Sequence, residues 1–176
     1  MNRLLPLAVA LLLAACGSTP PTQYYQLPDS AFRLPENRAA TRHATAVRVR
    51  LAEPIGSGSL LYQTDAHHLN LAQSNLWAAP LADTLAAAFA NRLNRSGGAL
   101  YLPAKLANDN APVLDIHLDR FQGSYRGQTE ISGTARRPDG SIKSFHVLTP
   151  QQGDGYPAMV DSLNRGLDGA AEQIGR

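Results

Sequence analysis

The sequence predicts an α+β fold: a single domain with a mixed, largely antiparallel sheet and two main helices packed on one face. Apolar residues recur at helical spacing in two places, over residues 81–93 and 157–174. Short alternating stretches, separated by turn residues, lie before and between these patterns and predict strands. The chain has 176 residues, enough for one domain with its own core after a leader is removed.

Residues 1–15 predict a signal peptide. Arg3 gives a positive start, residues 4–13 are mostly apolar, and small residues follow. The apolar run is shorter than the ~20 residues that a membrane-spanning helix needs. Residues 13–16, Leu-Ala-Ala-Cys, resemble the lipobox of bacterial lipoproteins. The resemblance implies cleavage before Cys16 and acylation of that residue, palmitate being a typical chain. An ordinary secreted protein with a chance cysteine is the alternative.

Residues 16–23 are expected to be the lipidated cysteine and a tether, which Pro20 and Pro21 stiffen. Acyl chains contribute about 0.8 kcal/mol per buried CH2, so several chains on one cysteine would make a durable anchor. Gly17, and not Asp, follows the cysteine. In the lipoproteins that the lipobox resembles, this implies the periplasmic face of the outer membrane. Residues 24–176 remain as the folded domain.

The charge and cysteine content exclude some classes of protein. The formal net charge is only +2, and Arg136-Arg137 is the only adjacent pair of basic residues. Nucleic acid binding needs clustered cations on one face, so none is expected. Cys16 is the only cysteine, so no internal disulfide stabilises the domain.

The first half of the domain predicts edge and hairpin strands. Residues 24–27 form a short β-like run that Pro28 closes, as is typical of a sheet edge. Residues 46–51 alternate between apolar and polar side chains and predict a half-buried strand. Residues 60–63 and 68–71 predict two short strands of a hairpin.

The strongest helical pattern follows this hairpin. Its apolar stripe has four-residue spacing and consists of Leu81, Leu85, Phe89 and Leu93. Pro80 suits the first turn of the helix, and the Ser-Gly-Gly sequence at 96–98 ends it. Trp77 precedes the helix and is expected to plug its start.

The second half predicts an antiparallel meander and a final helix. A short strand at 99–102 precedes three longer ones, at 113–121, 128–136 and 142–148. The final helix, over 157–174, contains Gly166 and Gly169, which each cost about 1 kcal/mol in a helix interior relative to Ala. Close approach of the helix to the sheet would explain these glycines.

Two groups of polar residues are candidates for a metal site or a catalytic base. Asp115, His117 and Asp119 share one face of a strand and could bind a metal, but a solvated strand face is the favoured interpretation. Asp65 beside His67-His68 could orient a base, although a turn flank is favoured. No nucleophile elbow, P-loop, dinucleotide fingerprint or paired zinc cysteines occur in the sequence. We therefore expect no enzyme activity, metal or cofactor.

Five segments carry a family resemblance. They lie at 24–28, 61–64, 75–81, 121–125 and 153–156, and the most specific is Asn-Leu-Trp-Ala-Ala-Pro-Leu at 75–81. Together they resemble the paraquat-inducible protein C family, within the transport-auxiliary lipoproteins of ABC-type systems. The resemblance implies a non-enzymatic outer-membrane lipoprotein that is an auxiliary subunit of an MCE-type intermembrane lipid transport system and supports membrane integrity. Its expected partner is an MCE-domain periplasmic tunnel protein.

The expected contact residues lie around the predicted hairpin. They are Leu60, Leu61, Tyr62, Gln63 and Trp77. Apolar side chains on both faces of a short strand would leave one face for a partner, unless residues 29–45 cover it. For Trp77, burial in the core is the favoured alternative. The symmetric rings of MCE proteins, as a family, further imply a homo-oligomeric ring of this domain around the lipid path. Its expected surface is the strand at 60–63 with the loop at 56–59.

Two other functions remain open at this point. A periplasmic lipid-binding carrier would need a large apolar cavity of its own. A hydrolase would need polar side chains that converge in a cleft. The only candidates for such a cluster in the sequence are Asp115, His117 and Asp119.

Overall fold

The computed structural model describes residues 20–35, 44–95 and 98–176. The predicted signal peptide at 1–15 and the predicted lipidation site Cys16 lie outside the described residues. So does most of the Ser-Gly-Gly sequence that is expected to end the first helix.

The described residues form a sheet of eight strands with two α-helices. The strands are β1 (Gln23–Tyr25), β2 (Ala44–Leu51), β3 (Ser59–Gln63), β4 (Leu69–Trp77), β5 (Leu100–Pro103), β6 (Val113–Ser124), β7 (Gln128–Arg136) and β8 (Ile142–Pro150). The helices are α2 (Leu81–Arg95) and α3 (Gly155–Gly175), and short 3-10 turns lie at Ile55–Ser57 and Ala104–Leu106.

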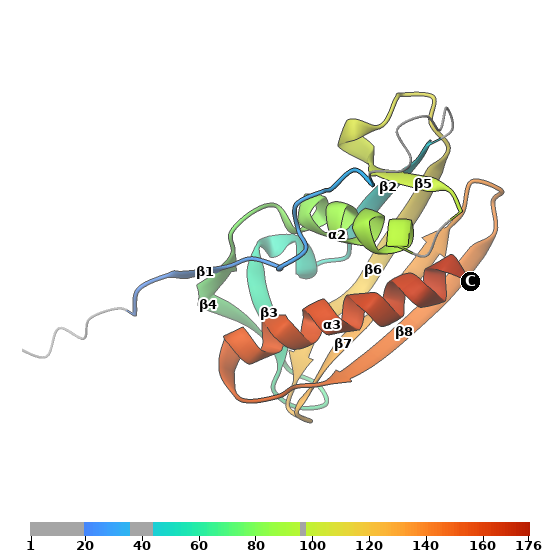
Figure 1. The fold of residues 1–176 in the computed structure, drawn as a ribbon. Helices are drawn as coiled ribbons and strands as arrows, with labels where there is room; N and C mark the ends of the chain where they lie inside the picture. The colour runs from blue at the N-terminus through green and yellow to red at the C-terminus, as the bar shows by residue number, and fades with distance from the viewer. Residues whose placement is uncertain (1–19, 36–43, 96–97) are drawn as a thin grey trace, which may run out of the picture.

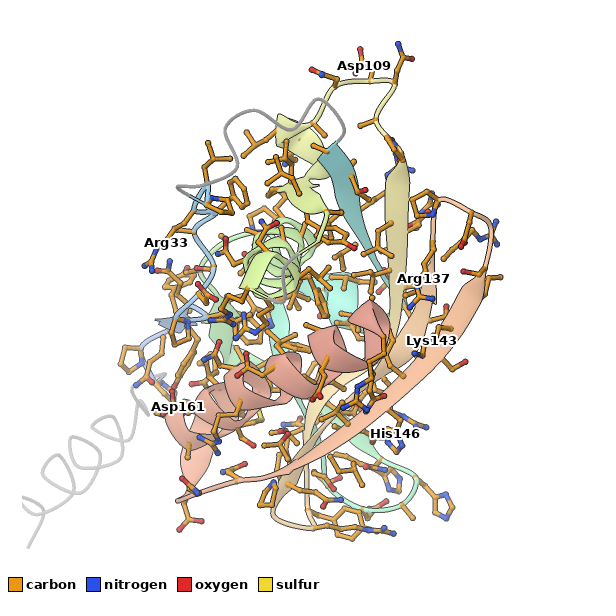
Figure 2. The ribbon with its side chains drawn as sticks, turned by 45° about the vertical axis from the view of Figure 1, so that its right-hand side comes forward. Arg33, Asp109, Arg137, Lys143, His146 and Asp161 are labelled. Carbon is orange, nitrogen blue, oxygen red and sulfur yellow. The ribbon has the colours of Figure 1, made fainter. Side chains whose placement is uncertain are left out.

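Both helices pack on the same face of the sheet, which confirms the predicted α+β architecture (Figure 1). Helix α2 lies over β2 and β5, and α3 crosses β7 and β8. Side chains fill the layer between the helices and the sheet, while Asp161 lies on the exposed side of α3 (Figure 2). The apolar core therefore lies on one side of the sheet, and the outer face of β6–β8 is largely polar.

The antiparallel meander is confirmed, because β7 pairs with β6 from Asp115 to Ser124 and with β8 along its full length. On its other side β6 pairs in parallel with β2, and then with the end of β3. Two more parallel pairs, β2 with β5 and β1 with β4, complete the sheet. The order β1-β4-β3-β6-β2-β5 thus brings segments from both halves of the chain together around β6.

The predicted apolar stripe of α2 is buried as expected, since none of its four members is more than 5% exposed. The glycines of α3 are explained by close approach to the sheet. A Cβ atom on Gly166 would lie 2.9 Å from Thr149 Oγ1, and one on Gly169 would lie 3.3 Å from Val147 Cγ1. Larger residues at these positions would push the helix away from β8.

Strand β4 is longer than predicted, and this changes the place of Trp77. The expected strand ended at residue 71, whereas β4 continues to Trp77 and pairs there with β1. The Trp77 ring lies 5.8 Å from the Phe121 ring, centroid to centroid. Trp77 therefore closes a strand and packs in the core, and does not act as a separate plug at the helix start.

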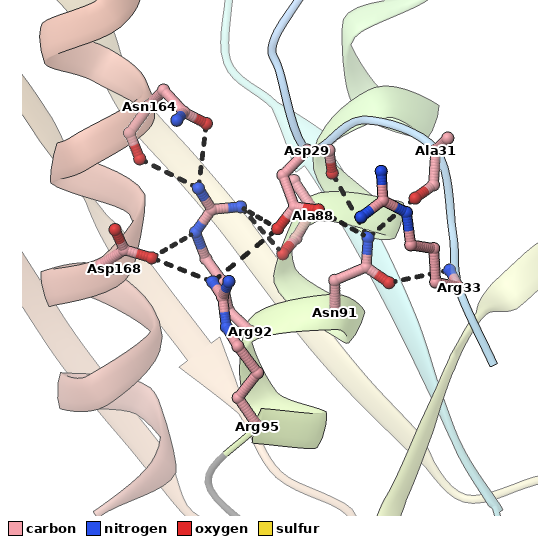
Figure 3. Close-up of polar contacts among 9 residues, drawn as sticks. All are labelled: Asp29, Ala31, Arg33, Ala88, Asn91, Arg92, Arg95, Asn164 and Asp168. Atoms are coloured by element: carbon pink, nitrogen blue, oxygen red, sulfur yellow. Dashed lines mark hydrogen bonds and ion pairs between the residues drawn. The ribbon is translucent and has the colours of Figure 1, made fainter. Parts of the chain in front are cut away.

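A buried arginine joins the two helices to the N-terminal segment (Figure 3). Arg92 on α2 is 4% exposed, and its guanidinium contacts Asp168 on α3 and Asp29 in the N-terminal segment. Next to it, Asn91 Oδ1 accepts a hydrogen bond from the backbone N–H of Arg33 at 3.0 Å, and its amide donates to the carbonyl of Ala31 at 2.8 Å. These contacts hold the segment that follows β1 against α2.

The edge formed by β8 is partly covered by a side chain of α3. The amide of Gln173 accepts a hydrogen bond from the backbone N–H of His146 at 3.1 Å and donates one to its carbonyl at 3.2 Å. It therefore pairs with His146 as a neighbouring strand would, at the position that Figure 2 labels on β8. This pairing reduces the tendency of an edge strand to add another chain.

Candidate functional site: a tyrosine pocket at one end of the sheet

A hollow of about 570 Å³ lies where β3 ends, β6 turns into β7 and β8 leads into α3. We call it the tyrosine pocket. It is lined by Tyr62, Ser124, Tyr125, Gly127, Gln151, Gly153, Asp154, Gly155, Tyr156 and Met159. These elements meet at the end of the molecule that Figure 1 draws at the bottom.

Backbone hydrogen bonds hold the rim of the pocket in place. The N–H of Tyr125 donates to the carbonyl of Gln63 at 2.8 Å, and the N–H of Gln151 donates to the carbonyl of Gly127 at 2.9 Å. Gly127 adopts a φ of +70°, which side chains other than glycine rarely adopt. The turn after β6 is thus tied both to β3 and to the end of β8.

The apolar floor of the pocket depends on Gly123. A Cβ atom at this position would collide with Met159 Sδ and would lie 2.9 Å from Tyr62 Cδ2. Glycine therefore allows the Tyr62 ring and the Met159 side chain to lie directly against the backbone of β6. Any larger residue would displace one of them.

Tyrosine side chains surround this floor. The Tyr25 and Tyr156 rings lie 6.2 Å apart, centroid to centroid, with an interplanar angle of 56°. Burial raises the pKa of Tyr156 above its usual value, and the nearby Tyr25 and Tyr62 add to the effect. The Tyr25 hydroxyl lies 2.8 Å from Gln23 Oε1 and 3.0 Å from Asn75 Oδ1. The hydroxyls of Tyr62 and Tyr156 have no such partner among the described residues.

A second hollow, of about 310 Å³, lies beside Tyr25 and is lined by residues of the N-terminal segment and the start of α2. Trp77 contributes to its wall but is only 8% exposed. Tyr25 borders this second hollow and also stacks near Tyr156 of the tyrosine pocket. Both hollows therefore lie next to β1, where the predicted tether joins the domain.

The structure corrects the expectation for Leu60 and Leu61. They are 0% and 2% exposed and belong to the core, so neither offers a side chain to a partner. The reason is that β3 is an interior strand between β4 and β6, and its apolar side chains on both faces are packed in the core, so neither face is left for a partner. Tyr62 and Gln63 at the end of β3 are half-buried, and Tyr62 lines the pocket.

The polar trio on β6 lies on the outer face of the sheet. Asp115 accepts a hydrogen bond from Arg50 Nε at 3.2 Å, and His117 Nε2 lies 3.4 Å from Asp119 Oδ1. The alternation with buried Leu114, Ile116 and Leu118 confirms the solvated strand face. Within the described ranges, no group of three His, Cys, Asp or Glu side chains has the arrangement of a metal site. That the protein binds no metal stays a prediction.

The two histidines of the hairpin flank a turn, as expected. Asp65 accepts hydrogen bonds from the backbone N–H groups of His67 at 2.8 Å and His68 at 2.9 Å. The His67 N–H, followed by the His68 ring, lowers the pKa of the Asp65 carboxyl below its usual value. His68 Nδ1 lies 2.8 Å from Asp65 Oδ2, but both side chains are exposed and neither lines the tyrosine pocket. The pair therefore stabilises the turn.

Sequence reasoning missed most of the pocket. Of the predicted contact residues only Tyr62 lines it, whereas Tyr125, Tyr156 and Met159 were not singled out as contacts. A usable signal was present, because Gly-Ser-Tyr at 123–125 and Gly-Tyr at 155–156 each place a tyrosine beside a glycine turn. What the sequence did not reveal is that the two turns meet.

Neither helix in the described part of the chain has the length and apolar character needed to cross a membrane.

The chain belongs to a class of auxiliary lipoprotein components of transport systems. A family model described as "ABC-type transport auxiliary lipoprotein component" matches residues 25–175, and the chain belongs to this family. All five segments named from the sequence fall within or at the border of this range.

Individual proteins and solved structures are also similar to this chain. The Intermembrane transport lipoprotein PqiC of Escherichia coli (strain K12) is 26% identical over 169 residues, covering 93% of this chain and 90% of that protein. The protein of the same name from Shigella flexneri matches equally. A crystal structure of an uncharacterized protein superposes with a TM-score of 0.72 at 25% identity, covering 89% of this chain and 97% of the other. A Xanthomonas campestris protein at 18% identity, with a TM-score of 0.59 and coverage of 87% and 93%, shares the fold.

Proposed function

We propose that this protein is a non-enzymatic subunit of an intermembrane lipid transport system. Cys16 anchors it to the periplasmic face of the outer membrane, where it docks an MCE-domain tunnel protein and so supports membrane integrity. Lipid extraction and ATP use belong to other subunits. The observation that carries the proposal is the family match over residues 25–175. The names of the E. coli and Shigella flexneri relatives support transport between membranes.

The geometry supports docking better than catalysis. The side chains that line the tyrosine pocket are aromatic, amide, hydroxyl and one carboxylate, and Tyr62, Tyr125, Tyr156 and Met159 dominate it. Tyrosine supplies rigid contact area with a polar tip and is enriched at protein interfaces. No described histidine lines this pocket, and the His68–Asp65 pair lies at the exposed hairpin, away from it.

A lipid carrier is the runner-up, and the chemistry of the pocket disfavours it. A carrier needs walls that are apolar over the length of an acyl chain. The tyrosine pocket is lined by Gln151, Asp154 and Ser124 as well as by aromatic rings. These groups would lose their hydration against a hydrocarbon chain without gaining hydrogen bonds.

The partner is tested by purifying the full-length lipoprotein from detergent extracts of the native cells. An MCE-domain protein should co-purify in a fixed ratio. A Cys16→Ala variant is the matched control, because it should lose membrane association but still bind the partner once both are in detergent. Absence of any MCE-domain protein from the wild-type material would contradict the proposal.

The anchor is tested by mass spectrometry of the mature N-terminus. The first residue should be Cys16 carrying acyl chains, with residues 1–15 removed. An unmodified terminus, or a start at another residue, would remove the membrane anchor from the proposal.

The proposal includes a homo-oligomeric ring. Burial of Leu60 and Leu61 removes the surface first expected to form it, so the ring rests on the symmetry of the proposed partner. Light scattering on the domain without residues 1–16, with and without the partner, measures its mass. A strictly monomeric mass at high concentration in both cases would contradict the ring.

A further inference from the structure

We propose that the tyrosine pocket binds an extended peptide segment of a protein partner, in which an apolar side chain lies next to a basic one. The inference rests on the proposed function, which supplies a protein partner, and it adds the surface and the chemistry of recognition. It follows from two accessible hydroxyl groups, a hollow above a packed apolar floor and an unpaired carboxylate in one place.

The first observation is a pair of free hydroxyl groups. Tyr62 and Tyr156 are half-buried and line the pocket, yet no hydrogen bond joins either hydroxyl to another described residue. The neighbouring Tyr25 hydroxyl, by contrast, is engaged by Gln23 and Asn75. No buried side-chain oxygen or nitrogen among the described residues lacks a partner, so both hydroxyls are reached by solvent and are available to a ligand. The carbonyl groups of an extended peptide would supply uncharged acceptors for these hydroxyls.

The second observation is the floor. Met159 is 2% exposed and packs with the Tyr62 ring against Gly123. Three further glycines in the lining leave the space above this floor free of side chains: Gly127, Gly153 and Gly155. The volume of about 570 Å³ lies within the range of roughly 300–1,000 Å³ that is typical of ligand sites. One apolar side chain and the backbone around it fit such a space.

The third observation is the carboxylate of Asp154. This exposed residue is the N-cap of α3, but its side chain makes no capping hydrogen bond. No ion pair involving it occurs among the described residues. A lysine or arginine beside the apolar anchor of the peptide would pair with this carboxylate. It would contribute more to specificity and to the rate of association than to affinity.

The same chemistry argues against a lipid as the occupant. An acyl chain offers no acceptor to the Tyr62 and Tyr156 hydroxyls and would desolvate Asp154. The phosphate of a headgroup with net negative charge would be repelled by the same carboxylate. A peptide satisfies all three groups with its own carbonyls and one cationic side chain.

The pocket is also organised before binding. The hydrogen bonds from Tyr125 to Gln63 and from Gln151 to Gly127 fix the turn, and the Gln151 amide donates to the carbonyl of Gly153 at 3.0 Å. A preformed site avoids the entropic cost of ordering a loop on association. The peptide is then the component that becomes ordered.

The site of contact is tested by cross-linking in intact cells. A photoreactive amino acid replaces Tyr125, a pocket residue that is exposed, and in a control it replaces the exposed Ile142 on the outer face of the sheet. Mass spectrometry should map the Tyr125 cross-link to one segment of a protein, with an apolar and a basic residue together. Cross-links to lipid alone, no cross-link, or equal cross-linking of the same segment from Ile142 would overturn the inference.

The chemistry is tested with that segment as a synthetic peptide, titrated onto the purified full-length protein in detergent. Tyr62→Phe and Tyr156→Phe should each weaken binding about three- to tenfold, the usual effect of one lost hydrogen bond. Asp154→Asn should weaken it and flatten its salt dependence, and Asn is as good a helix cap as Asp. Tyr101→Phe on β5, outside the pocket, is the matched control.

The outcomes separate this inference from the proposed function. If the peptide binds the three pocket variants as tightly as the wild type, the tyrosine pocket is not the site. If the MCE-domain protein still co-purifies with those variants undiminished, docking stands and occurs elsewhere. If no MCE-domain protein co-purifies with the wild type, the proposed function itself is contradicted.

Discussion

Arg92 on α2 and Asp168 on α3 are joined by a hydrogen bond of 2.9 Å between Nε and Oδ1. Burial lowers the pKa of Arg92 below its usual value, and the charges of Asp168 and Asp29 oppose this effect. The guanidinium also donates to the carbonyl of Asn164 at 3.0 Å and to that of Ala88 at 3.2 Å. One side chain thereby connects both helices to the segment that leads from β1.

Replacing this arginine should destabilise the domain. Arg92→Leu keeps much of the side-chain volume but removes the buried donor that joins two helix carbonyls and the carboxylates of Asp29 and Asp168. We expect the free energy of unfolding to fall by about 2–4 kcal/mol, measured by urea denaturation. Arg95→Ala is the matched control, since Arg95 contacts the same carboxylates but is 61% exposed. Its effect should stay below about 1 kcal/mol. Equal effects of the two variants would contradict a special role for the buried group.

The bulge between β6 and β7 makes Gly133 irreplaceable. A Cβ atom at Gly133 would collide with the carbonyl oxygen of His117 and would lie 3.1 Å from Leu118 Cα. Both are backbone atoms of β6, next to the register shift in the pairing, so they cannot rotate away. Gly133→Ala should therefore lower the melting temperature, with a loss of about 1–3 kcal/mol or more. The neighbouring Ser132→Ala should have little effect, and similar melting curves for the two variants would show that the strands can move apart.

The apolar stripe of α2 should behave as core. Leu85 is completely buried, so Leu85→Ala should destabilise the protein by about 2–5 kcal/mol. Leu106→Ala, at an exposed position, is the control and should be near neutral. Thermal unfolding of both variants measures the difference. A shift within error for Leu85→Ala would mean that the stripe is a partner surface.

Tyr156 should make stability fall at alkaline pH. Its pKa is raised above the ordinary value of 10.0, so the folded protein holds the phenol proton more tightly than the unfolded chain does. The contribution is fully present below pH 10.0 and is lost as the pH rises through the higher pKa of the folded state. Between about pH 9 and 11, the free energy of unfolding of the wild type should therefore fall relative to that of Tyr156→Phe. Urea denaturation across this range, with ultraviolet titration of the tyrosines, would detect it. A parallel pH dependence of the two proteins would contradict the shift.

The helices, the meander and the solvated strand face could be predicted because each depends on local periodicity. The stripe from Leu81 to Leu93 requires a helix with one apolar side, whatever it packs against. Proline, aspartate and glycine at 138–140 set the turn between β7 and β8 in the same local way. The alternation around Asp115 likewise separates a buried from a solvated face.

The pairing of distant segments was decided by the tertiary structure alone. Whether β3 is an edge or an interior strand depends on the parallel pairing of Tyr62 with Gly123, which no local pattern encodes. In this arrangement Leu60 and Leu61 are buried, and the Trp77 ring lies beside the Phe121 ring.

By itself, the sequence determined the class of fold, the position of the predicted lipidation site Cys16 and the family resemblance, since these rest on composition, spacing and short motifs. Only the tertiary structure brought Tyr62, Tyr125 and Tyr156 to one pocket. The physical reason is that a pocket forms where chain ends and turns meet, and their meeting depends on strand order and helix packing across long separations in the sequence.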